Sequence, residues 1–276
     1  MPPPATHSKY LIDFSTQGRD DMAHLIYTND GEEIEYKDII SDEPVDRRFM
    51  EMIADVAPYT LTARNGIEAL YGLFKAVQYI VEKKIPGDFV ECGVWRGGAI
   101  IMCALTLKYF GVMDRKIYLY DTFEGMTAPE ERDIDWDGVS EKEKWDTAQE
   151  IAKGHPEATL RSGFGGNMES VRNNVLTTGY PEENFIFIKG PVEETIPAAV
   201  PSSISLLRLD TDWYSSTYHE LVHLYPRLNT GAVLIIDDYG WCRGAREATD
   251  QYFKEKNPKM FLTRTDSSVR MGVKLD

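Results

Sequence analysis

The chain has 276 residues, of which 30 are Lys or Arg and 45 are Asp or Glu, so its formal net charge is −15 at pH 7. This negative charge repels phosphate backbones and argues against nucleic acid as a partner. The sequence has no apolar run of about 18 residues and no basic-then-apolar start, which predicts a cytoplasmic protein with no membrane partner.

Residues 1–84 are expected to form an N-terminal arm and a helical cap. The arm contains an acidic and irregular stretch, YTNDGEEIEYKDIISDEP. Helical periodicity follows in RRFMEMIADVA and in IEALYGLFKAVQYIVEKK, where apolar residues recur every three or four positions.

From residue 85 to residue 276, short β-rich runs alternate with helical stretches. This alternation is typical of a mostly parallel sheet covered by helices on both faces, a Rossmann-like α/β fold. The two tail segments 261–265 and 268–275 predict a hairpin, so the sheet should contain an antiparallel edge strand. Strands are expected at 88–94, 116–122, 185–190, 205–210 and 232–238, and helices at 99–110, 167–179, 215–228 and 243–256.

A long polar segment at 124–166 interrupts this alternation. Insertions of this kind after a strand are usually lids, binding loops or disordered segments. Trp136 and Trp145 stand among many charged residues, which favours a lid. A solvated loop with two half-buried tryptophans is the alternative.

A glycine-rich turn follows the first predicted strand of this domain. In VECGVWRGGAI, Glu91 and Gly93 precede Gly97, Gly98 and an apolar helix. Glycines allow the backbone to approach a ligand closely, and a helix N-terminus offers free amides. The spacing differs from the G-x-G-x-x-G of dinucleotide enzymes, so strand-to-helix packing without a ligand stays open.

The next predicted strand ends at Asp121, where an acidic residue can accept both hydroxyls of a ribose. A turn or helix cap is the alternative for this residue. Glu91, immediately before the glycine turn, would repel a phosphate but would attract a cationic methionine group. The two acidic residues therefore favour S-adenosylmethionine over a dinucleotide.

Four aspartates follow two neighbouring predicted strands. Asp210 and Asp212 end one strand, and Asp237 and Asp238 end the next. Parallel strands lie about 4.8 Å apart, so these carboxylates should converge at the ligand-binding edge of the sheet. Converging carboxylates need protons or a hard divalent cation such as Mg²⁺, Mn²⁺ or Ca²⁺. Helix capping by one of these aspartates is the alternative.

His219-Glu220-Leu221-Val222-His223 matches the zinc motif H-E-x-x-H. Chance matches to this short pattern are common, and no further metalloprotease signature follows. We therefore expect the two histidines to be surface or lid-facing groups on the helix between two strands.

Several blocks together resemble the macrocin O-methyltransferase family, whose members include sugar methyltransferases of macrolide and aminocoumarin antibiotic pathways. The resemblance covers roughly residues 58–256. It implies a class I methyltransferase that uses S-adenosylmethionine and Mg²⁺ to methylate a sugar hydroxyl. The blocks that carry the resemblance are GDFVECGVWRGGA, IYLYDTFEGM, ESVRNNVLTTGYP, KGPVEETIP, LDTDWYSST and IIDDYG.

The resemblance also implies a role for individual residues. Asp210, Asp237 and Asp238 would hold the metal, and Asp212 would take the proton of the acceptor hydroxyl. The chain departs from the family mainly in its first 50 residues and at 127–166, so the acceptor is the least transferable property. Cofactor contacts fall on Thr60, Leu61, Glu91, Cys92, Gly93, Val94, Trp95, Arg96 and Asp121.

The sequence thus predicts a metal-dependent O-methyltransferase that acts on a glycoside or polyol. Members of the family that the chain resembles tend to form oligomers, so a homo-oligomer is expected. Two alternatives remain, a catechol-type O-methyltransferase and a non-catalytic protein that binds S-adenosylmethionine. We expect the three cysteines, Cys92, Cys103 and Cys242, to be buried and reduced.

Overall fold

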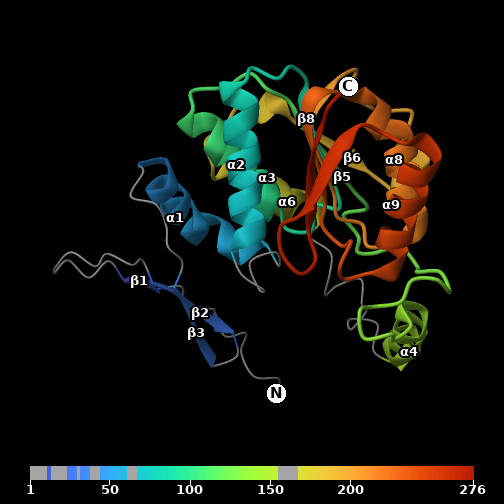
Figure 1. Cartoon of the computed structure of the whole chain (residues 1–276). Coiled ribbons are helices and arrows are strands. Elements are labelled where there is room, and N and C mark those ends of the chain that lie inside the picture. Colours follow the sequence, from blue (N-terminus) through green and yellow to red (C-terminus); the bar gives the residue numbers. More distant parts are fainter. Residues whose placement is uncertain (1–10, 14–23, 30–31, 38–43, 61–66, 155–166) are drawn as a thin grey trace.

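The structure is a computed structural model that describes residues 11–13, 24–29, 32–37, 44–60, 67–154 and 167–276 (Figure 1). In these ranges, no helix has the length and apolar character needed to cross a membrane.

A seven-stranded sheet lies at the centre of the molecule, in the order β6-β5-β4-β7-β8-β10-β9 (Figure 1). Strands β4 to β8 run parallel, and β10 pairs antiparallel with both β8 and β9. The prediction of a mostly parallel sheet with antiparallel pairing at one edge is confirmed. The strands are β4 (Asp88–Cys92), β5 (Ile117–Asp121), β6 (Phe185–Lys189), β7 (Ile204–Leu209), β8 (Leu228–Ile236), β9 (Met260–Arg264) and β10 (Arg270–Lys274).

Helices cover both faces of this sheet (Figure 1). Successive side chains of a strand point to opposite faces. Leu206 accordingly packs in a core cluster with α1, α2, α3 and α6, whereas Leu207 packs in a second cluster with α8 and α9. The helices are α1 (Pro44–Val56), α2 (Glu68–Glu82), α3 (Gly98–Tyr109), α4 (Glu141–Gly154), α6 (Met168–Leu176), α7 (Val192–Thr195), α8 (Tyr214–Leu224) and α9 (Arg243–Lys256), with short 3-10 helices η1 (Ala57–Tyr59), η3 (Glu182–Asn184) and η4 (Tyr225–Arg227).

The predicted N-terminal helices form as α1 and α2, and both pack against α3. Helix α3 is buried on nearly every side. A helix that is apolar all round requires partners all round, and α1, α2 and α6 provide them together with the sheet.

The acidic opening of the chain is not irregular where the structure describes it. Strands β1 (Leu11–Asp13), β2 (His24–Asn29) and β3 (Glu32–Lys37) form a small antiparallel sheet outside the central one (Figure 1). Asn29 pairs with Glu32, so the link between β2 and β3 is the dipeptide Asp30-Gly31. Asp-Gly between two strands is a strong hairpin signal, and the expectation of an irregular segment was wrong because it considered only charge.

The predicted lid segment is tied to the loop that follows β8. Asp135 forms a β-bridge with Cys242, and Arg243 N donates to Ile134 O at 2.8 Å. Helix α4 then projects from this anchored base (Figure 1). Residues 155–166 of the predicted lid lie outside the described residues.

All three cysteines are free and buried, as predicted.

Candidate active site

A cavity of about 620 Å³ lies at the carboxyl ends of β4, β5, β7 and β8. The chain leaves β4 toward β5 on one side, whereas β7 lies on the other side of β4. Open α/β sheets bind ligands at such a switch point. Residues that directly follow these strands line the cavity, together with part of the segment 125–145.

The glycine turn after β4 is held tightly against the loop after β7. Gly93 has a left-handed φ of +82°, and its amide donates to Tyr120 O at 2.9 Å. A Cβ at residue 93 would lie 1.9 Å from the carbonyl oxygen of Asp210. Close approach of two backbones therefore requires glycine here, whatever ligand binds.

Gly93→Ala is expected to lower the free energy of unfolding by more than about 4 kcal/mol, because the new Cβ would push β4 and β7 apart. Gly111→Ala is the matched control, since Gly111 has a φ of +74° and no heavy atom within 4 Å of an added Cβ. The control bears only the left-handed backbone strain, about 1–2 kcal/mol. Urea denaturation of both variants measures the difference, and equal losses would show that the close approach to Asp210 is unimportant.

The carboxylate of Asp121 is tied to the glycine turn. Its Oδ2 accepts hydrogen bonds from the amides of Val94 and Trp95 at 2.7 and 3.0 Å, and its Oδ1 accepts one from Phe123 N at 2.7 Å. Burial raises the pKa of Asp121, and these three amides oppose that shift. The turn-stabilising role considered for Asp121 is thus present, and ribose binding stays a prediction.

Two residues that line this cavity each have a buried polar atom without a hydrogen-bond partner in the described part of the chain. These atoms are Oε2 of Glu91 and Nε1 of Trp95. Glu91 is only 3% exposed. A buried polar atom without a partner costs free energy, so a ligand with a hydrogen-bond donor and an acceptor would fit here.

The other predicted cofactor contacts differ in their placement. Thr60 and Val94 line the cavity. Cys92 packs in the core cluster that contains α8, and the guanidinium of Arg96 lies over the ring of Trp95, 4.6 Å from its centroid. Neither of these two side chains lines the described cavity. Leu61 lies outside the described residues.

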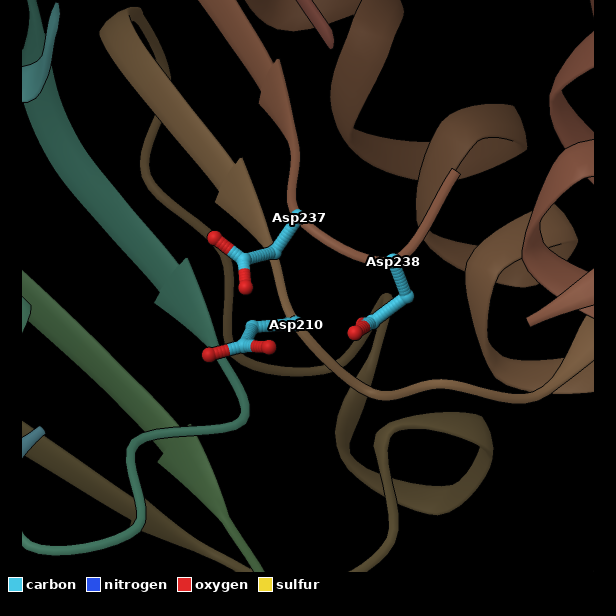
Figure 2. Close-up of side chains that lie close together, drawn as sticks. All are labelled: Asp210, Asp237 and Asp238. Carbon is cyan, nitrogen blue, oxygen red and sulfur yellow. The ribbon is translucent and has the colours of Figure 1, made fainter. Parts of the chain in front are cut away.

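The predicted metal ligands come together, and all three line the cavity. Figure 2 shows Asp210 after β7 and Asp237 and Asp238 after β8, with their carboxylates directed toward a common point. One oxygen from each lies within 4.8 Å of the other two. Three carboxylate oxygens in this arrangement suit a hard cation such as Mg²⁺, which binds oxygen at about 2.1 Å.

Asp212 lies beside this group. Its amide donates to Asp238 Oδ2 at 3.2 Å, and its φ of +64° is left-handed, which is uncommon for a residue with a side chain. Burial raises the pKa of Asp212, and the charge of Asp210 adds to this effect. Burial also raises the pKa of Asp238, next to the charge of Asp212. The D-x-D loop therefore places a second carboxyl group next to the predicted ligands.

Arg208 is a counterion of the cluster that the sequence analysis did not identify. Its guanidinium donates to Glu91, to Asp210 at 2.7 Å and to Asp237 at 2.6 Å. Its side chain is 5% exposed. Burial alone would lower the pKa of Arg208, but the charges of Asp210 and Asp237 outweigh it and raise this pKa. The expectation that only protons or a metal could neutralise the aspartates was therefore incomplete.

One arginine does not neutralise all the carboxylates that surround it. Burial raises the pKa of Glu91 to about 8 and that of Asp237 to about 7, although Arg208 lowers both. The nearby charge of Asp210 acts in the same direction as burial on each of them. The site thus retains an excess of negative charge that a divalent cation would relieve.

The H-E-x-x-H segment does not form a zinc site in this structure. Glu220 is fully buried and accepts hydrogen bonds from Thr211 Oγ1 at 3.0 and 3.2 Å. His219 Nε2 lies 2.9 Å from the carbonyl oxygen of Ile196, and the rings of His219 and His223 pack 4.4 Å apart. Glu220 therefore holds the D-x-D loop through its hydrogen bonds with Thr211, and it does not form a site with the two histidines.

Comparison with known proteins identifies the family of the chain. The model of the family described as macrocin-O-methyltransferase (TylF) matches residues 19–271. Demethyldecarbamoylnovobiocin O-methyltransferase of Streptomyces niveus is 32% identical over 187 residues, which are 68% of this chain and 66% of that protein. Mycinamicin III 3''-O-methyltransferase of Micromonospora griseorubida is 31% identical over 188 residues, 68% of each protein.

The match thus spans about two thirds of the length of these relatives. Among solved structures, the O-methyltransferase NovP superposes with a TM-score of 0.68 at 26% identity, over 84% of this chain and 100% of that one. The family model covers most of the chain, including both predicted strands that carry the aspartates. The chain therefore belongs to the macrocin O-methyltransferase family of enzymes.

Proposed function

We propose that this protein transfers a methyl group from S-adenosylmethionine to a hydroxyl of a sugar, carried by a glycosylated natural product, with the help of a divalent metal ion. The observation that carries the proposal is the approach of Asp210, Asp237 and Asp238 to within 4.8 Å beside the cavity after β4. Relatives named for the O-methylation of demethyldecarbamoylnovobiocin and of mycinamicin III support the choice of acceptor and a role in antibiotic biosynthesis.

The methyl donor would occupy the part of the cavity formed by the glycine turn. S-adenosylmethionine supplies a methyl group that its positive sulfonium makes electrophilic. Glu91 Oε2, which has no protein partner in the described ranges, is suited to its ammonium, and Trp95 Nε1 is suited to an acceptor atom. Asp121 would bind the ribose through lone pairs that the backbone amides leave free.

Asp210, Asp237 and Asp238 would hold the metal. An ion held by these residues would lower the pKa of an acceptor hydroxyl and would fix its orientation. Arg208 keeps Asp210 and Asp237 oriented by holding one oxygen of each. Asp212 lines the same cavity and is assigned the role of general base, taking the hydroxyl proton as the oxygen attacks the methyl carbon.

The remaining task of the protein is to exclude water from the reacting groups. Trp145 of α4 and Trp213 after the D-x-D loop line the cavity. We assign the exclusion of water to the segment 124–166 and to the N-terminal unit 1–84. Residues 85–276 would form the methyltransferase domain. This division of the chain is part of the proposal.

Incubation of the full chain with labelled S-adenosylmethionine and a panel of glycosides tests the function. The proposal predicts labelled product with a glycoside in Mg²⁺ and none after chelation with EDTA. Product from catechols alone would indicate the aromatic-diol alternative. Tight donor binding without a methylated product from any acceptor or cell extract would indicate a non-catalytic binding protein.

Mg²⁺ should bind more tightly as the pH rises from 6 to 8. Burial raises the pKa of Asp237 to about 7, so its carboxyl group must lose a proton before it can ligate the ion. The ionised fraction of Asp237 alone rises about tenfold over this range, and the affinity should rise by at least this factor, because the pKa of Asp238 is raised as well. Calorimetric titration at pH 6, 7 and 8 measures the Mg²⁺ affinity. In Asp237→Asn this affinity should depend less steeply on pH. An affinity that falls with pH would contradict the site.

A further inference from the structure

The tryptophans of this protein gather around one cavity. The chain has five, and Trp95, Trp145, Trp213 and Trp241 line the cavity described above. The fifth, Trp136, packs against Trp241 with ring centroids 6.3 Å apart. Two of these residues are not exposed. Trp95 lies within the glycine turn and is half-buried. Trp213 is 5% exposed and donates from Nε1 to Thr127 O at 3.0 Å.

Trp136 and Trp241 are different because both are exposed. Trp136 is 64% exposed and Trp241 is 44% exposed. Large apolar side chains that remain exposed side by side usually mark a contact with a ligand or a partner. We call this pair the rim indoles.

The rim indoles are fixed relative to the predicted metal ligands. Asp238 O accepts a hydrogen bond from Trp241 N at 3.1 Å, so a single turn joins the ligand Asp238 to Trp241. Such a turn keeps its ends within about 7 Å. On the other side, the bridge between Asp135 and Cys242 holds Trp136 against the same loop. A molecule whose hydroxyl reaches Asp238 would therefore have within reach Trp241, which lines the cavity, and Trp136, which packs against Trp241.

The charges of the cavity narrow the chemistry of that molecule. Among the described residues, the cations that line it are Lys144 and Arg208. Lys144 is paired with Asp135 at 2.5 Å and Glu141 at 2.8 Å, and Arg208 is paired within the aspartate cluster. Even with one divalent ion held by Asp210, Asp237 and Asp238, the further carboxyl groups that line the cavity and the pairing of both basic side chains disfavour a pyrophosphate. A neutral or cationic acceptor fits better.

We propose that Trp136 and Trp241 form a stacking subsite for an aromatic or flat apolar ring attached to the acceptor sugar, an inference that rests on the proposed function. The ring is the aglycone of a finished glycoside. Glycosyl transfer is then the reaction that supplies the substrate, and a nucleoside diphosphate sugar is not methylated efficiently.

Binding of matched glycosides tests the subsite. Phenyl and methyl glycosides of the same hexoses and 6-deoxyhexoses are titrated calorimetrically into the full chain with S-adenosylhomocysteine and Mg²⁺, beside thymidine diphosphate rhamnose. Wild type should bind at least one phenyl glycoside about tenfold more tightly than its methyl partner, as aromatic stacking predicts. Trp136→Ala and Trp241→Ala should each reduce this ratio, the double variant should abolish it, and Trp→Phe should retain part of it.

Phe261→Ala is the matched control, since Phe261 is an exposed aromatic residue, 69% accessible, on the edge strand β9. It should leave the ratio unchanged. A ratio that persists in the double variant, tighter binding of the nucleotide sugar, or no glycoside binding while S-adenosylhomocysteine still binds would each overturn the subsite. The last result leaves donor binding intact, whereas a wild type that binds no S-adenosylhomocysteine contradicts the proposed function itself.

Light scattering of the same variants separates a ligand site from a subunit contact. The proposal predicts one molar mass for wild type and both alanine variants. A smaller mass for Trp136→Ala with an unchanged phenyl preference would assign the rim indoles to an interface between copies of the chain and overturn the proposal.

Discussion

Asp210→Ala or Asp237→Ala should reduce Mg²⁺-dependent methyl transfer on the order of a thousandfold, while the dissociation constant of S-adenosylmethionine stays close to that of wild type. Each substitution removes one of the carboxylates that approach within 4.8 Å of one another. Loss of a metal that orients and acidifies the hydroxyl costs several kcal/mol of transition-state stabilisation. Rates with saturating donor, measured over a range of Mg²⁺ concentrations, give the effect.

Asp55→Ala provides the control, because Asp55 is an exposed acid on α1. This variant should keep the activity and the Mg²⁺ response of wild type. Full activity of Asp210→Ala or Asp237→Ala would refute the metal site. A loss that appears equally in donor binding would point instead to a collapse of the loops after β7 and β8.

Arg208→Met should lower the free energy of unfolding in EDTA by about 3–5 kcal/mol, the range seen when one partner of a buried ion pair is removed. Arg208 donates to three carboxylates, and its side chain is 5% exposed. Without it, the repulsion among those carboxylates is no longer compensated. Mg²⁺ replaces part of the lost positive charge, so it should stabilise Arg208→Met more than it stabilises wild type.

Arg172→Met is the matched control, because Arg172 forms a single ion pair with Glu182 and both side chains are about half exposed. Exposed pairs contribute about 0–1 kcal/mol, so little change is expected. Urea denaturation with EDTA and with Mg²⁺ gives all the values. Equal losses in the two variants, or a loss in Arg208→Met that Mg²⁺ does not reduce, would contradict the counterion role.

The convergence of the aspartates could be predicted because it depends on features that a sequence contains. Asp210 and Asp237 each follow a short apolar run, and such runs form buried parallel strands. The carboxyl ends of neighbouring parallel strands lie at the same edge, which places the two side chains together. The glycine turn was predictable for a similar reason, since Gly93 and Gly97 both adopt a left-handed backbone that glycine allows and most other residues do not.

Arg208 could not be assigned in the same way because its role depends on strand order. Glu91 and Arg208 are paired in register on β4 and β7, although 117 positions separate them in the chain. Nothing local indicates that β7 lies beside β4. The one available signal was the charge itself, since an arginine inside the apolar run SLLRLD must find a partner if that strand is buried.

The role of Glu220 was not predicted, because the H-E-x-x-H motif that contains it indicates a zinc site. On α8, Glu220 faces the core and the D-x-D loop, while His219 contacts the backbone of Ile196. Helical periodicity was the available signal, since Glu220 lies four positions after the buried Ser216 and four before the buried Leu224, on the same face of α8. The contact between the rim indoles likewise could not be predicted, because Trp136 and Trp241 are far apart in the sequence and meet through the pairing of residues 134–135 with residues 242–243.

Anomalous diffraction from crystals grown with Mn²⁺ and S-adenosylhomocysteine would locate the divalent ion directly. A manganese peak is expected among the carboxylates of Asp210, Asp237 and Asp238, next to density for the donor product in the cavity after β4. A peak at another position, or donor density with no manganese between these three side chains, would contradict metal-assisted methyl transfer by this protein.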